Sequence, residues 1–204
     1  MWSATGSWRS PDGTERVVWN IWDHEDPVEH DSWNSGFYGE LGKDWTHANS
    51  VNYDEGRDSY LFSLANMDVI YEINRTTGEI MNRFSQDSVI SGNVYNFQHD
   101  PNWTADGTLL MISYPEEEPA MAIEYAVDSD GNLTEIWSFA RDSRGSTLLG
   151  QARRLDNGNT FLNFGGLGEM REVTAEGNTI WQLNTGLGSW FGNVMLLESL
   201  PVVP

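Results

Sequence analysis

The sequence contains no cysteine, and of its 11 basic residues only Lys43 is a lysine. Without cysteine the chain has no disulfide, no thiol nucleophile and no thiolate ligands for zinc. Because 31 acidic residues give a formal net charge of −20, the surface repels nucleic acid and anionic membranes. We therefore expect neither a nucleic-acid nor a membrane partner.

Long apolar runs and helical periodicity are also absent. No stretch approaches 18 consecutive apolar residues, so we expect no transmembrane helix. No long stretch has apolar residues at a period of 3.6, so we expect no substantial helix. The segment 1–4 lacks the basic region and the apolar run of a signal peptide. Since strong acidity suits a secreted or salt-exposed protein, we expect a periplasmic or extracellular location; a generic acidic surface is the alternative.

What the sequence does contain is an internal repeat. His47, His99 and Gln151 follow one another at steps of 52 residues, and a weaker fourth copy places Asn193 another 42 residues on. Each polar residue stands where a repeat unit begins its first strand. Repeats of this length indicate a solenoid or a propeller.

Each repeat unit contains two hairpin patterns. Acidic or amide residues beside glycine, which tolerate positive φ, separate short apolar runs, as in β-hairpins. The turns of the first hairpins are predicted at 54–56, 105–107 and 156–158, and those of the second at 77–78, 130–131 and 176–177. Two hairpins make four antiparallel strands, which is one propeller blade.

The pattern predicts an all-β chain folded as a single β-propeller domain. A length of 204 residues is sufficient for one domain with an adequate core. About four blades of four antiparallel strands are visible, and both ends of the chain contribute to a shared blade. The predicted blades are 1–22 with 191–200, 45–84, 97–140 and 149–184, with 23–44 as a connecting loop.

Two histidines and several acidic segments have weak metal-binding signals. His24 and His30 have acidic neighbours in an expected exposed loop, where a metal role is possible but not required by the spacing. The segment 128–132 superficially resembles a calcium loop, but its glycine is misplaced and the repeat needs a turn there. The acidic run 116–118 is expected to be solvated. We therefore predict no metal site and no cofactor.

The repeat itself predicts a candidate site. His47 and His99 open inner strands, so their side chains should point toward the central channel, where propellers commonly bind ligands. Asn49 and Arg153, two residues beyond aligned positions, share strand parity with them. Together with Gln151 they form the candidate constellation. The alternative is that the histidines only make hydrogen bonds between blades.

Several segments, in order, resemble one family. The string Asp44-Trp45-Thr46-His47-Ala48-Asn49-Ser50-Val51 resembles the His-x-Asn-Ser segment of bacterial arylsulfotransferases, which do not use the nucleotide sulfate donor. Further matching segments are 70–79, 97–100, 150–160 and 186–192. The resemblance covers most of the chain from about Val17 onward.

The resemblance implies a six-bladed propeller that transfers a sulfuryl group from an aryl sulfate to a phenol by a ping-pong mechanism in the central channel. His99 would be the nucleophile, and His47 and Asn49 would hold the sulfuryl oxygens. A neutral imidazole is able to attack sulfur, and charge on the oxygens needs donors placed in advance. A second histidine could protonate the leaving oxygen. The family pattern has an arginine where Ala65 is aligned.

Two other functions remain open. The chain could be a non-catalytic propeller, serving as a ligand-binding or protein-interaction module, or a propeller that binds a cofactor of the pyrroloquinoline quinone type. Because about four blades are visible where the family has six, a homo-oligomer that completes the propeller is a further expectation. An open ring exposes strand edges and apolar blade faces, which favours pairing with another copy.

Overall fold

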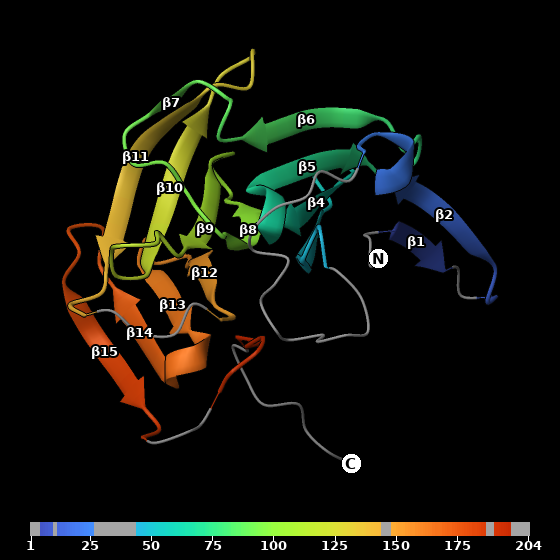
Figure 1. Ribbon diagram of the computed structural model, residues 1–204. Coiled ribbons are helices and arrows are strands. Elements are labelled where there is room, and N and C mark those ends of the chain that lie inside the picture. Colours follow the sequence, from blue (N-terminus) through green and yellow to red (C-terminus); the bar gives the residue numbers. More distant parts are fainter. Residues whose placement is uncertain (1–4, 10–11, 27–43, 144–147, 187–189, 197–204) are drawn as a thin grey trace.

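The computed structural model describes residues 5–9, 12–26, 44–143, 148–186 and 190–196. Within these ranges the chain is all-β, with 15 strands in four sheets and no α-helix (Figure 1). The predicted fold class is confirmed. No helix among the described residues is long and apolar enough to span a membrane.

Three sheets are blades whose four main strands pair with one another in chain order. The β3–β6 blade consists of β3 (Ala48–Asp54), β4 (Ser59–Leu64), β5 (Val69–Asn74) and β6 (Ile80–Ser85). The β8–β11 blade consists of β8 (His99–Trp103), β9 (Leu109–Ser113), β10 (Met121–Val127) and β11 (Leu133–Ala140). The β12–β15 blade consists of β12 (Gln151–Arg154), β13 (Thr160–Phe164), β14 (Glu169–Val173) and β15 (Thr179–Asn184). The short strand β7 (Ile90–Ser91), which the repeat did not predict, pairs in parallel with β11.

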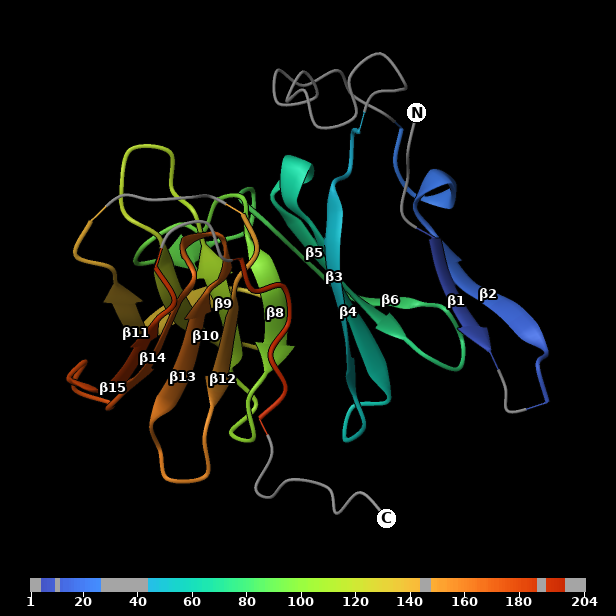
Figure 2. The same cartoon turned by 90° about the horizontal axis from the view of Figure 1, so that it is seen from below.

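The fourth sheet is an N-terminal hairpin of two strands beside the β3–β6 blade (Figure 2). It consists of β1 (Thr5–Arg9) and β2 (Glu15–Asn20), followed by the short 3-10 helix η1 (Ile21–Asp23). Residues 190–196 contain no strand, and 197–200, the rest of the predicted closing strand, lie outside the described residues. The shared blade therefore stays a prediction, and His30 likewise lies outside the described residues.

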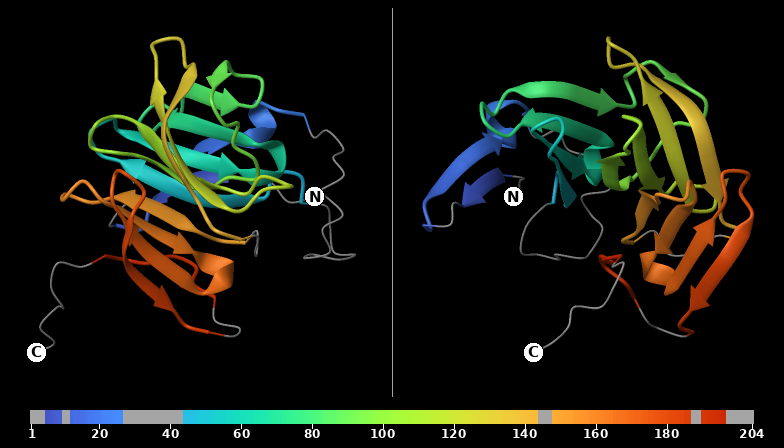
Figure 3. Two further views of the ribbon diagram at one scale, coloured as in Figure 1. Left: turned by 90° about the vertical axis from the view of Figure 1, so that its left-hand side faces the viewer. Right: turned by 180° about the vertical axis from the view of Figure 1, so that it is seen from behind.

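The hairpin and the three blades follow one another around an open arc (Figures 1 and 3). The first strands of the blades, β3, β8 and β12, contact one another in turn and form its inner wall. The C-terminal segment 190–196 returns to the β12–β15 blade, where the Phe191 N–H donates to the Gly165 carbonyl at 3.0 Å. The first residues of each blade are thereby brought close to the end of the described chain.

The hydrophobic core is divided into three clusters, each between adjacent sheets. Alternation along the strands places apolar side chains on both faces of a blade, so each face packs against the next sheet. The largest fully buried members are Trp45, Tyr71, Tyr95, Tyr125, Phe84 and Phe164. Burying one large apolar side chain contributes about 1.5–3 kcal/mol, so these interfaces hold the arc together.

Two close contacts join neighbouring sheets. Gly78, in a turn with φ of +77°, lies so close to β2 that a Cβ there would be 2.3 Å from the Val18 carbonyl oxygen. Glu72 has no exposed side-chain surface and accepts from Arg57 Nε at 2.6 Å, and from Trp103 Nε1 of the next blade at 3.1 Å. The turn at Gly78 therefore packs directly against the β1–β2 hairpin, and the Glu72 carboxylate links two blades.

Candidate functional site

His99 is the first residue of β8, at a break in the regular pairing. It lies opposite Ile112, and the register of β8 against β9 shifts between His99 and Asn102. Asp100, between them, has a left-handed backbone with φ of +56°, which only a few residue types adopt without strain. Such bulges redirect side chains away from strict alternation. The local backbone therefore determines where the His99 imidazole points.

His99 lines a pocket of about 260 Å³ at the inner wall. Its lining comes from β3, β8, the start of β12 and the C-terminal segment: Asn49, Ser50, Val51, His99, Asp100, Leu149, Gly150, Gln151, Gly192 and Asn193. Three of the five predicted site residues, Asn49, His99 and Gln151, are thus brought together. His47 and Arg153 do not belong to this lining.

Burial favours the neutral form of His99. Burial lowers the pKa of His99 below its usual 6.5; the neighbouring Asp100 charge and a hydrogen bond to the Gly150 backbone oppose this, and His47 adds to it. The Nδ1 atom is buried and has no hydrogen-bond partner. At neutral pH the imidazole is therefore unprotonated at one nitrogen, the state that a nucleophile needs.

Asn49 lies on β3 with its amide group committed to β8. Its Nδ2 donates to the Gln98 carbonyl at 2.8 Å, and its Oδ1 is buried without a hydrogen-bond partner. Ser63 Oγ donates to the same carbonyl at 3.2 Å. Because Gln98 precedes His99, Asn49 fixes the backbone from which the histidine extends.

Gln151 holds the C-terminal segment against the pocket. Its Nε2 donates to Asn193 Oδ1 at 3.2 Å, and its Oε1 accepts the Val194 N–H at 3.0 Å. The side chain is only 4% exposed, so both ends of the amide are used within the fold. In this structure Gln151 closes the pocket wall and leaves little capacity for further hydrogen bonds.

His47 precedes β3 and has a left-handed backbone with φ of +44°. Its Nδ1 lies 2.7 Å from Asp44 Oδ2, and its ring stacks on Phe97 with the centroids 5.4 Å apart. Burial raises the pKa of Asp44, but the hydrogen bonds from the His47 ring and backbone outweigh it and hold that pKa below its usual value. The Ala65 N–H donates to the His47 carbonyl at 3.1 Å, so Ala65 is adjacent to this histidine.

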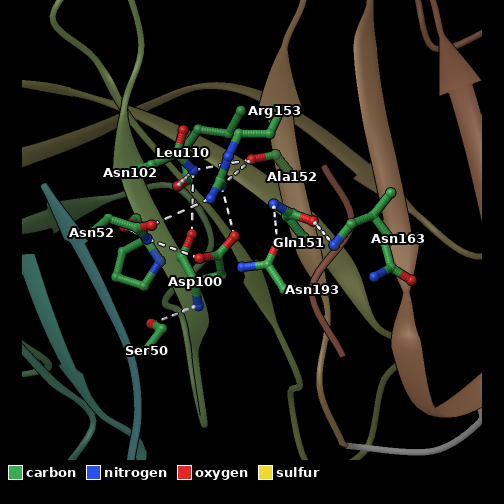
Figure 4. A network of polar contacts seen from close by, with 12 residues as sticks. Ser50, Asn52, Asp100, Asn102, Leu110, Gln151, Ala152, Arg153, Asn163 and Asn193 are labelled. Atoms are coloured by element: carbon green, nitrogen blue, oxygen red, sulfur yellow. Dashed lines mark hydrogen bonds and ion pairs between the residues drawn. The ribbon is translucent and has the colours of Figure 1, made fainter. Parts of the chain in front are cut away.

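Arg153 is bound to three inner strands (Figure 4). Its Nη1 lies 2.6 Å from Asp100 Oδ2 on β8, and its Nη2 donates to Asn52 Oδ1 on β3 at 3.3 Å. Nη1 also donates to the Ala152 carbonyl of its own strand at 2.9 Å. The guanidinium charge is therefore paired with a carboxylate that is itself buried.

The other segments considered in the sequence have structural contacts. His24 stacks on Trp19, with the ring centroids 5.6 Å apart and an interplanar angle of 12°. Asp128 Oδ1 accepts the N–H groups of Asp130 and Asn132, both at 2.9 Å, as in a hairpin turn. Among the described residues, no group of three histidine or acidic side chains is arranged to hold a metal ion.

Three residues of the site were not predicted: Asp44, Asn52 and Asp100. Asp44 had one signal, its position three residues before a histidine, which suits a turn that returns the carboxylate to the ring. Asn52 and Asp100 had none, because their contact joins strands 48 residues apart, with Asn52 Nδ2 donating to Asp100 Oδ1 at 2.8 Å. Long-range pairs of this kind follow from the arrangement of the blades.

Fold and pocket together define a β-propeller with a polar pocket at its inner wall. Residues 10–98 match the model of the arylsulfotransferase (ASST) family, which confirms the resemblance for that part of the chain. This matched segment includes His47 and Asn49 and ends one residue before His99. A comparison with curated proteins found no match.

Solved structures share the fold at low sequence identity. Virginiamycin B lyase from Staphylococcus aureus aligns with a TM-score of 0.53 and 9% identity, over 90% of this chain and 49% of the lyase. A functionally unknown protein from Desulfotomaculum acetoxidans aligns with a TM-score of 0.52 and 12% identity, over 91% and 51%. The Cps50 (Swd1) β-propeller domain from Myceliophteria thermophila aligns with a TM-score of 0.50 and 11% identity, over 88% and 53%. The chain thus spans about half the length of these propellers.

Proposed function

We propose that this propeller transfers a sulfuryl group between phenolic compounds through His99. The observation that carries the proposal is a neutral histidine in a pocket shared with Asn49, beside a segment that matches the arylsulfotransferase family. Neutral imidazole is a competent nucleophile, and burial is what keeps His99 neutral at physiological pH. An aryl sulfate is the donor and a second phenol is the acceptor.

The transfer takes place in two balanced steps. An unprotonated ring nitrogen of His99 forms a bond to sulfur while the bond from sulfur to the phenolic oxygen breaks, and the departing phenolate takes up a proton. A second phenol, on losing its proton, then attacks the sulfur, and the nitrogen–sulfur bond breaks to regenerate neutral His99. Splitting the exchange in this way replaces one difficult displacement by two easier ones.

His47 and Asn49 have supporting roles in this proposal. Asp44 fixes the orientation of the His47 ring, as a carboxylate commonly does for an acid–base histidine. Asn49 anchors the carbonyl of Gln98, directly before the nucleophile, and its amide lines the same pocket. Because Asn49 Nδ2 already donates to that carbonyl, Asn49 acts in this proposal by holding the backbone of the nucleophile.

The test is covalent labelling of the whole chain with para-nitrophenyl sulfate, followed by intact-mass spectrometry. We expect one added sulfuryl group per chain and release of one equivalent of nitrophenol before any acceptor is added. His99→Asn should abolish both signals. His24→Asn is the matched control, because His24 stacks on Trp19 outside the pocket. Absence of an adduct from mildly acidic to alkaline pH would rule out the transfer.

A non-catalytic, ligand-binding propeller is the second candidate. It is supported by the shortage of free positive charge: Ala65 stands where the family pattern has an arginine, and Arg153 is already paired with Asp100. An anionic sulfate gains less from such a pocket than from one with an unpaired guanidinium. Calorimetric binding of the phenol or the aryl sulfate, with no adduct in the mass spectrum, would favour this candidate.

We also propose that a second copy of the chain completes the ring. The proposal is supported by alignments that cover only about half of each propeller, and by Ile180, Trp181 and Leu183, which are 57%, 46% and 41% exposed on β15. Sedimentation velocity should then give a dimer whose population falls on dilution. A monomer at all concentrations would refute the proposal. The acidic surface supports placing this assembly in the periplasm or outside the cell.

A further inference from the structure

Arg153 and Asp100 form the centre of a polar network that joins the inner strands (Figure 4). The guanidinium contacts Asp100 Oδ2 at 2.6 Å and Asn52 Oδ1 at 3.3 Å. Asn52 Nδ2 donates in turn to Asp100 Oδ1 and to the Pro101 carbonyl, both at 2.8 Å. Arginine, the carboxylate and the amide therefore close a ring of contacts across β3, β8 and β12.

The network acts on the backbone next to His99. Asp100 has a φ of +56°, and its N–H donates to Ser50 Oγ on β3 at 3.1 Å. Aspartate adopts this backbone more readily than most residues, and here Oδ2 is ion-paired with Arg153 while Oδ1 and the N–H are hydrogen-bonded. Because Asp100 follows His99 directly, these contacts set the direction of the histidine at the bulge.

We infer that Arg153 is a positioning residue, which acts on His99 through the Asp100 carboxylate and does not bind the sulfuryl group itself. The inference rests on the proposed role of His99 as the nucleophile. The geometry supports it in two ways: Arg153 is outside the lining of the pocket, and its guanidinium forms an ion pair with Asp100 and donates to Asn52 and to its own strand.

The same contact places a positive charge beside the carboxylate that follows His99. Burial lowers the pKa of His99, the Asp100 charge and the hydrogen bond to the Gly150 backbone raise it, and the His47 charge lowers it. Arg153 offsets the charge of Asp100 from β12. Removing the guanidinium leaves the carboxylate unbalanced, so His99 should take up a proton at higher pH.

The experiment follows the His99 ring by nuclear magnetic resonance during a pH titration of the whole chain. Only four histidines are present, and the spectrum of His99→Asn assigns the signal. Arg153→Gln should raise the pKa of His99 by about 0.5–1 pH unit. Asp100→Asn should lower it, because the negative charge that raises the pKa of His99 is lost, while asparagine tolerates the left-handed backbone. Arg153→Lys keeps the charge without the planar fork, so the pKa should stay near that of the parent while the labelling rate falls.

Arg154→Gln is the matched control from the adjacent position on β12. Arg154 pairs with Glu124 and lies over the Trp137 ring, at 5.0 Å from its centroid, so the pKa of His99 should not change. Thermal melting identifies any variant that fails to fold, and the Asp100→Asn titration then serves in its place. An unchanged pKa in both Arg153→Gln and Asp100→Asn would overturn the inference.

This readout separates the inference from the proposed function. The titration needs no substrate, so it tests the link from Arg153 to His99 even in a chain that forms no sulfuryl adduct. An adduct together with unchanged titrations would leave sulfuryl transfer standing and refute the role of Arg153. Shifted titrations without an adduct would refute sulfuryl transfer and retain the link from Arg153 to His99.

Discussion

Asp44 contacts His47 twice. Its Oδ2 lies 2.7 Å from the ring Nδ1, and its Oδ1 accepts the backbone N–H of the same histidine at 2.8 Å. One carboxylate therefore fixes both the left-handed backbone of His47 and the orientation of its ring. Since both side chains are largely buried, the pair is protected from the screening that weakens surface contacts.

We expect Asp44→Asn to separate these two contacts. The asparagine oxygen still accepts the backbone N–H, but its NH₂ group cannot accept from Nδ1. The rate of sulfuryl labelling should fall about 10–100-fold if His47 acts as an acid–base group, with a loss of about 1 kcal/mol in stability. Asp106→Asn, in an exposed turn, is the control. Labelling at the parental rate would show that the ring contact is not required.

The labelling rate should also depend on pH through His99. Burial holds the pKa of His99 below 6.5, so its neutral, reactive form predominates above pH 6.5 and is lost as the pH falls through the lower folded value. Stopped-flow measurement of nitrophenol release across this range gives the apparent pKa. An apparent pKa above 6.5 would contradict the assignment of the nucleophile.

Glu72 should make the fold sensitive to acid. Burial raises the pKa of Glu72, but hydrogen bonds from Arg57, Asn82 and Ser59 outweigh it, so the folded pKa lies below 4.5. The contribution of ionised Glu72 to the free energy of unfolding is therefore fully present above about pH 4.5 and is lost as the pH falls through the folded pKa. Denaturant unfolding at a series of pH values measures this loss.

The matching variant is Glu72→Gln. Its free energy of unfolding at neutral pH should be about 2–3 kcal/mol lower than that of the parent, because Arg57 loses its charged partner. The access of Arg57 to water limits the loss. The variant's free energy of unfolding should also change less with pH than that of the parent. Glu172→Gln serves as the control, since Glu172 accepts from Asn157 and Asn159 at the molecular surface. Parallel pH curves for Glu72→Gln and the parent would contradict the assignment.

The interface between the last two blades can be tested with two leucines of one blade. Leu162 on β13 is fully buried against the β8–β11 blade, and Leu183 on β15 is 41% exposed. We expect Leu162→Ala to cost about 3 kcal/mol and Leu183→Ala less than about 1 kcal/mol. Chemical denaturation of the two variants measures the difference. Equal losses would mean that this blade does not pack as described.

Alanine variants of Gly78 and Gly107, which share one backbone conformation, distinguish the cost of backbone strain from that of a steric contact. Gly78 and Gly107 have φ of +77° and +76°, but a Cβ at Gly78 would meet the Val18 carbonyl, whereas nothing lies within 4 Å at Gly107. Both alanine variants should carry the cost of positive φ, about 1 kcal/mol. Only Gly78→Ala should in addition release the hairpin, detected as faster hydrogen exchange in β1 and β2. Equal exchange in both variants would contradict the close approach.

The turns were predicted from the sequence with most success. Gly78, Gly131 and Gly177 were expected to follow hairpin strands, and all three have positive φ, of +77°, +80° and +82°. This signal is local, because glycine adopts such a backbone without strain. The strand β7 was missed because two residues give no periodicity, and its pairing depends on the position of β11.

The candidate site was predicted only in part, for a reason visible in the backbone. The parity argument grouped His47 with Asn49 and assumed regular alternation along an extended strand. His47 instead has positive φ and precedes β3, and Asp100 introduces a bulge after His99. The pocket still brings together Asn49, His99 and Gln151, although the strand register shifts at Asn49 and directly after His99.

The amide of Asn102 has a mechanical consequence for the arc. Its Nδ2 lies within 3.2 Å of the carbonyl oxygens of Asp100, Leu110 and Ala152, so one side chain binds β8, β9 and β12. The outer strand β15, in contrast, is exposed along its length. We therefore expect thermal motion to displace the outer strands of the blades more than the inner strands beside His99.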